Sequence, residues 1–144
     1  QNLVRVEEFK NQLHTAQSNY EKLISSPEER TIYERFKQAE SSYDAFSSRF
    51  AELANAMKVG RGLDDGVQVG PMANQRGLET IQKMTQDALD RGAELLAGGK
   101  PPAGFNKGYF VEPTVLGRVP DDAMVMTEEP FGPIAPITTS FATV

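Results

Sequence analysis

Glycine is missing from the first 58 residues of this 144-residue chain, and no other sequence feature constrains the fold as much. All twelve glycines lie beyond Lys58, as do all nine prolines except Pro27. Because glycine and proline interrupt helices, the first part can form long helices, whereas the second must contain turns. We therefore predict two dissimilar parts, residues 1–58 and residues 59–144.

The first part carries apolar residues at alternating spacings of three and four, the pattern of helices that pack along one seam. Between the two runs, Ser26 suits an N-cap, Pro27 the first helical position and Glu29 a capping box. The sequence thus predicts a long antiparallel helical hairpin, whose second helix spans about residues 27–57 without a break at Ser41 and Ser42. The predicted seams are Val6, Phe9, Leu13, Ala16, Tyr20 and Leu23, then Ile32, Phe36, Ala39, Tyr43, Phe46, Phe50, Leu53 and Met57.

The second part alternates turn formers with short periodic segments. Residues 59–71 are predicted to form a loop, and residues 73–92 hold a helix that ends with Gly92 at the C′ position. Strands are predicted within residues 93–99, 109–119 and 134–141, with Pro113 marking an irregularity. Strands separated by a helix indicate an α+β or α/β unit.

Composition and charge exclude several classes of function. The net charge of −5 disfavours binding to nucleic acid, and no apolar run is long enough to span a membrane. With no cysteine, disulfides, thiolate metal sites and cysteine nucleophiles are excluded. We predict no metal site, because His14 stands alone as a solvated helix residue and the pairs Asp64-Asp65 and Asp121-Asp122 suit turns.

Three stretches from about residue 43 to residue 144 resemble the NAD(P)-dependent aldehyde dehydrogenases. In order they are YDAFSSRFAELANAMKVGRGLDDGVQVGP from residue 43, DALDRGAELLAGGK from residue 87, and GYFVEPTVLGRVPDDAMVMTEEPFGPIAP from residue 108. The resemblance implies that residues 59–144, with the helix before them, form a partial catalytic-domain unit of that family.

The resemblance also implies two cofactor contacts. In these dehydrogenases the second glutamate of the matching motif holds the hydroxyls of the nicotinamide ribose, and the phenylalanine two residues later packs near the nicotinamide ring. Those positions are Glu129 and Phe131, with Pro130 where the family often has an apolar or β-branched residue. The family's route needs a cysteine nucleophile, so we expect no catalytic residue and no autonomous catalysis here. We therefore expect no bound cofactor in this chain: NAD(P) is implied by resemblance only, and both contacts are predicted to be ancestral and not functional here.

The first part resembles another family. Residues 6–40, VEEFKNQLHTAQSNYEKLISSPEERTIYERFKQAE, are similar to part of the four-helix-bundle sensor domain of bacterial methyl-accepting chemotaxis proteins. This resemblance covers about residues 1–41 and implies a chimera joined near Ser41-Ser42. We predict a structural domain that forms a homodimer through its hairpins. Two alternatives stay open: a dehydrogenase remnant with weak NAD(P) binding, and a small-molecule sensor module.

Overall fold

The computed structural model describes residues 2–105 and 107–138. It divides into two compact units, residues 1–44 and residues 45–144, each considered on its own below. The division falls inside a helix, and the domain boundary expected after residue 58 stays a prediction.

Two helices make up the first unit, α1 (Asn2–Leu23) and the first half of α2 (Pro27–Ala56). The predicted capping box is confirmed, since the backbone N–H of Glu29 donates to Ser26 Oγ at 3.1 Å. In return, Glu29 Oε2 accepts the backbone N–H of Ser26 at 3.2 Å and that of Ser25 at 2.9 Å. The single helix predicted across Ser41 and Ser42 is also confirmed, because α2 is continuous from Pro27 to Ala56.

The contact between α1 and α2 in the first unit differs from the predicted apolar seam. Among the described side chains of this unit, the buried one is Tyr33, whose hydroxyl donates to the backbone oxygen of Gln17 at 3.1 Å. Its ring lies 5.7 Å from that of Tyr20, and Gln17 Nε2 donates to Glu40 Oε2 at 2.6 Å. The predicted seam residues Ile32 and Phe36 are exposed, because the neighbouring position, Tyr33, faces α1 instead. The side chains of Val6 and Phe9 lie outside the described part of the structure.

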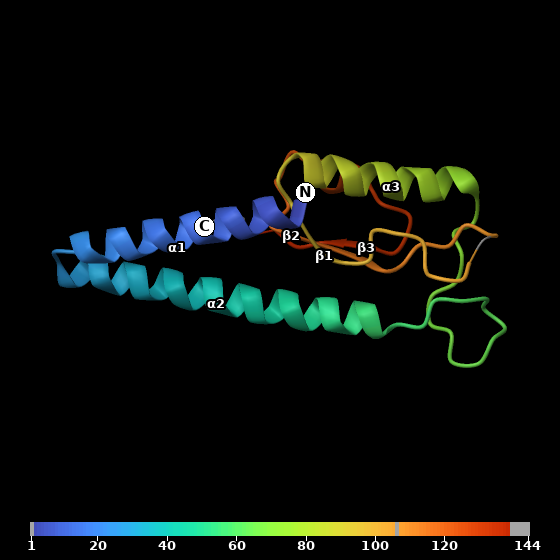
Figure 1. Cartoon of the computed structure of the whole chain (residues 1–144), viewed down its shortest axis with the longest axis horizontal. Helices are drawn as coiled ribbons and strands as arrows, with labels where there is room; N and C mark the ends of the chain where they lie inside the picture. The colour runs from blue at the N-terminus through green and yellow to red at the C-terminus, as the bar shows by residue number, and fades with distance from the viewer. Residues whose placement is uncertain (1, 106, 139–144) are drawn as a thin grey trace. The chain divides into compact units, whose positions relative to one another are not determined.

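The second unit holds a small mixed sheet, and Figure 1 shows helix α3 beside it. After α2, its elements are α3 (Gln75–Asp90), β1 (Glu94–Ala97), β2 (Thr114–Gly117), α4 (Met124–Thr127) and β3 (Ile134–Pro136). The strand order is β1-β2-β3, with β1 and β2 antiparallel and β2 and β3 parallel. All three strands were predicted, with longer bounds, and residues 139–141 of the last prediction lie outside the described residues. The short helix α4 was not predicted.

Local signals set both ends of α3. The side chain of Asn74 accepts the backbone N–H of Gly77 at 2.8 Å, which caps the helix start. At the other end Gly92 follows the C-cap residue with φ of 102°, a conformation that favours glycine. The prediction of Gly92 at the C′ position is therefore confirmed.

The sheet of the second unit has a helix on each face. Leu116 of β2 belongs to a buried cluster with Ile81, Met84 and Ala88 of α3. Its neighbour Val115 belongs to a second cluster, with Ala51 and Ala54 from the last turns of α2. Successive residues of a strand point to opposite faces, so α3 and the end of α2 cover opposite sides.

The face of α2 that is buried in the second unit is not the predicted one. The predicted seam residues Phe46, Phe50, Leu53 and Met57 are exposed, and small residues occupy the buried face. Small side chains allow the helix backbone to lie close to the sheet, which a row of aromatic residues would prevent.

Candidate functional site

Glu129 and Phe131 lie on a short loop between α4 and β3, within the second unit. Both are exposed, and 77% of Phe131 is accessible. The loop therefore exposes both an apolar ring and a hydrogen-bond acceptor, two residues apart in the chain.

The loop is held at both ends. On the α4 side, the backbone N–H of Glu128 donates to the oxygen of Met124 at 2.9 Å. On the β3 side, Gly132 sits so close to α3 that an added Cβ would lie 2.7 Å from Ile81 Cγ1. The next residue, Pro133, accepts the N–H of Thr114 of β2 at 2.7 Å. The backbone around Glu129 and Phe131 is therefore anchored to the core while both side chains face outward.

A charged cluster joins α3 to the start of α4. Asp87 Oδ2 accepts the backbone N–H of Met124 at 2.7 Å, and Arg91 Nε donates to both Asp87 oxygens at 3.0 and 3.1 Å. The Met124 N–H foremost, and then Arg91, hold the pKa of Asp87 below its ordinary value. Arg91 Nη1 also donates to Asp122 Oδ2 at 2.7 Å.

Sequence reasoning missed this cluster. The spacing of Asp87 and Arg91 is that of a helical ion pair and could have been read from the chain. Nothing in the sequence connects Asp87 with Met124, 37 residues later.

The arrangement at the loop suits non-covalent binding of a ligand rather than covalent catalysis. A carboxylate accepts hydrogen bonds from the hydroxyls of a diol, and an aromatic face packs against a planar ring. Within the described residues, no three metal-binding side chains gather into a site.

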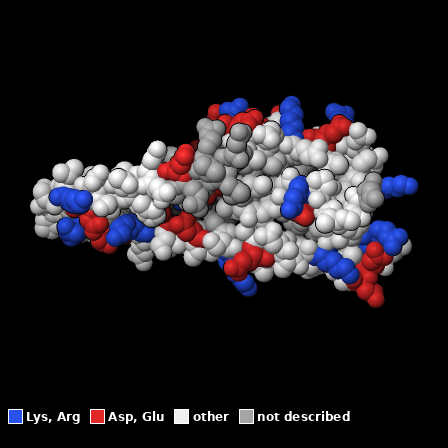
Figure 2. All heavy atoms as spheres, in the orientation of Figure 1, with Lys and Arg blue, Asp and Glu red and all other residues white. Residues whose placement is uncertain are grey.

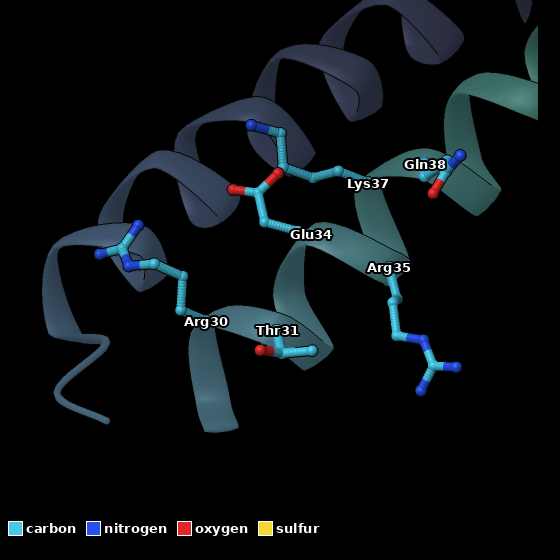
Figure 3. Close-up of a pocket in the computed structure, with 6 residues that line it drawn as sticks. All are labelled: Arg30, Thr31, Glu34, Arg35, Lys37 and Gln38. Atoms are coloured by element: carbon cyan, nitrogen blue, oxygen red, sulfur yellow. The ribbon is translucent and has the colours of Figure 1, made fainter. Parts of the chain in front are cut away.

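The remaining candidates are surface features of the separate units. His14 is exposed on α1, and Asp64 pairs with Arg61 at 3.2 Å in the loop after α2. A hollow on α2 is lined by six residues of that one helix, and Figure 3 shows Arg35 pointing away from Glu34 and Lys37. On the face drawn in Figure 2, basic and acidic side chains are interspersed among the described residues. None of these features gathers groups for a common chemical task.

The sequence matches the model of the aldehyde dehydrogenase family over residues 22–142. The chain belongs to this family. It is 41% identical over 109 residues to a succinate-semialdehyde dehydrogenase of Paenarthrobacter nicotinovorans, covering 76% of this chain and 24% of that protein. It is 43% identical over 95 residues to succinate-semialdehyde dehydrogenase [NADP(+)] 2 of Schizosaccharomyces pombe, covering 66% of this chain and 19% of the relative.

Solved structures agree with this assignment. The structure of a 3,6-anhydro-L-galactose dehydrogenase in complex with NAP matches with a TM-score of 0.62 and 40% identity, over 67% of this chain and 20% of that one. An aldehyde dehydrogenase of Mycobacterium tuberculosis complexed with NAD+ matches with a TM-score of 0.65 and 30% identity, over 68% of this chain and 20% of that one. The chain thus corresponds to about a fifth of these dehydrogenases.

The family match also bears on the predicted chimera. It begins at residue 22, so it includes half of the stretch that resembles a chemoreceptor, and the comparisons give the chemoreceptor resemblance no support.

In the described residues, every helix is too short or too polar to cross a lipid bilayer.

Proposed function

We propose that this chain forms a cofactor-contacting part of an NAD(P)-dependent aldehyde dehydrogenase. Glu129 accepts hydrogen bonds from the nicotinamide ribose, and Phe131 packs near the nicotinamide ring. The observation that carries the proposal is the anchored loop, which exposes an aromatic ring two residues after an exposed carboxylate. Membership of the family supports it, since the chemistry of hydride transfer belongs to the cofactor and the protein orients it.

A titration of NADH fluorescence against the 144-residue chain tests this proposal. Glu129→Gln should weaken NADH binding by about tenfold, because a hydrogen bond to a charged group contributes roughly 1.5–3 kcal/mol. Glu128→Gln is the matched control, since it removes a neighbouring exposed carboxylate and should leave binding unchanged. Equal affinity in both variants, or no binding by the unaltered chain, would refute the proposal.

By itself the chain is expected to produce no NAD(P)-dependent turnover of any aldehyde. It contains no cysteine, and a thiolate nucleophile is what the family's chemistry requires. An assay of NADH and NADPH formation with protein freed of host enzymes checks this. Turnover that follows the purified chain through two chromatographic steps would contradict it.

The substrate of the complete activity is proposed to be an aldehyde that also carries a carboxylate, because the two most similar relatives named above are succinate-semialdehyde dehydrogenases. Replacing the matching segment of the Paenarthrobacter enzyme with this chain's segment tests the proposal. Retained oxidation of succinate semialdehyde supports it, whereas a folded hybrid that binds cofactor but oxidises only uncharged aldehydes would contradict it.

A further inference from the structure

The helix that leads into the candidate loop has no cap of its own. α4 is four residues long, and its N-cap residue is Ala123, whose side chain cannot accept a hydrogen bond. The first N–H groups of a helix need acceptors from outside the helix. At α4 one acceptor comes from α3, where Asp87 Oδ2 lies 2.7 Å from the Met124 nitrogen. A side chain 37 residues earlier thus supplies the cap.

Asp87 is itself held in the orientation that this bond requires. Arg91, the C-cap residue of α3, donates through Nε to both Asp87 oxygens and through Nη1 to Asp122. Asp122 directly precedes Ala123, so the guanidinium bridges the end of α3 and the turn into α4. Charge-assisted hydrogen bonds are stronger than neutral ones, and the donors of a guanidinium have a fixed geometry, which suits a group that fixes the orientation of a carboxylate.

Apolar packing holds α4 against α3, and the charged cluster adds directional contacts at the start of α4. Ala123 and Val125 are buried in the same cluster as Met84 and Ala88 of α3. Apolar contact is not directional, so these residues fix the distance between the helices better than the angle. Beyond α4 the chain has only three residues, Glu128, Glu129 and Pro130, before Phe131. A rotation of α4 would therefore displace both proposed cofactor contacts.

We propose that Asp87 is a positioning residue for the cofactor: by capping α4 it fixes where Glu129 and Phe131 stand. The inference rests on the proposed function, because it assigns Asp87 a part in cofactor binding although its side chain contacts only protein groups. Arg91 supports Asp87 in this role.

The test compares three variants of the full chain. Asp87→Ala removes the acceptor, Asp87→Asn keeps an amide oxygen that can accept the Met124 N–H, and Asp90→Ala is the matched control. Asp90 lies in the same last turn of α3, and within the described residues its carboxylate accepts a local hydrogen bond from Gln86 at 2.7 Å. Amide hydrogen exchange by NMR reports on α4 and its loop, with the amides of Val115 and Leu116 as the reference for global unfolding.

Asp87→Ala should speed exchange of the Met124 amide by about tenfold relative to the reference amides, and should weaken NADH binding by about tenfold. Asp87→Asn should restore most of the slow exchange of the Met124 amide and most of the NADH affinity. Asp90→Ala should change neither the exchange rate nor the affinity. Recovery by the conservative variant distinguishes positioning from a general loss of stability.

Three results would overturn the inference. In the first, Asp87→Ala and Asp90→Ala give the same Met124 exchange rate, which refutes the cap. In the second, exchange rises in Asp87→Ala and NADH affinity is unchanged while Glu129→Gln lowers it, which refutes the positioning role and leaves the proposed function standing. In the third, neither the unaltered chain nor any variant binds NADH, which rejects the proposed function and the positioning role together.

Discussion

Ser47 carries a buried hydroxyl that lacks a hydrogen-bond partner among the described residues. It is 3% exposed, on the same face of α2 as Ala51 and Ala54. A buried unsatisfied hydroxyl costs about 1–3 kcal/mol, and serine is about 0.5 kcal/mol poorer than alanine within a helix. Ser47→Ala should therefore raise the free energy of unfolding in urea by about 1 kcal/mol more than Ser48→Ala, its exposed neighbour. Equal effects of the two substitutions would show that the Ser47 hydroxyl finds a partner in solution.

Glu29 makes the start of α2 sensitive to acid. The backbone N–H of Ser25, and then that of Ser26, hold the pKa of Glu29 below its ordinary value of 4.5. A carboxyl group whose pKa is lower in the folded state stabilises the fold above the ordinary pKa, and that stability is lost as pH falls through the lower folded value. The unfolding midpoint in urea should thus fall less in Glu29→Gln than in the unaltered chain between about pH 6 and about pH 3. Glu28→Gln, in the same helical turn, serves as the control, and identical pH profiles for the unaltered chain and Glu29→Gln would contradict the assignment.

At the scale of elements, α2 is the helix that crosses from the first unit to the second. Ser42 lies near the middle of α2, and its hydroxyl donates to the backbone oxygen of Gln38 at 2.9 Å. Proline at this position would remove a backbone donor and clash with the carbonyl one turn earlier, which costs about 3 kcal/mol or more.

Ser42→Pro should consequently lower the melting temperature followed by circular dichroism, whereas Ser42→Ala should leave it unchanged or slightly higher. If Ser42→Pro has the same melting temperature as the unaltered chain, the junction near residue 42 is a linker in solution, and the prediction of a continuous helix is wrong.

At the scale of the whole molecule, the exposed apolar residues at the end of α2 and directly after it predict self-association. Phe46, Phe50, Leu53 and Met57 follow the spacing of one helical stripe, and the rings of Phe46 and Phe50 lie 5.9 Å apart. Covering a large apolar side chain contributes roughly 1.5–3 kcal/mol, so two copies that pair these stripes would gain from four residues each. We expect a homodimer, with hairpins from two copies completing a four-helix bundle.

Light scattering over a range of concentrations measures the mass and so tests the dimer. Phe46→Glu places a charge in the stripe and should give a monomer, while Ser48→Glu, off the stripe, should keep the dimer. A monomeric mass of the unaltered chain at every concentration would contradict the prediction.

Short-range signals in the sequence determined where α2 begins and where α3 ends. Ser26, Pro27 and Glu29 fixed the start of α2, and Gly92 fixed the end of α3, because caps act within a few residues of the backbone groups they satisfy. The family motifs likewise pointed to Glu129 and Phe131, although their role stays a proposal.

The tertiary structure decided which faces are buried and what holds the candidate loop. The heptad pattern placed Phe46 and Leu53 inside, yet Ala51 and Ala54 lie against the sheet, because a close approach of helix and sheet admits small side chains. Apolar periodicity identifies a helix and does not say which neighbour it will meet. The hydrogen bond from Met124 to Asp87 joins residues 37 positions apart in the chain. These residues meet only because α4 packs on α3.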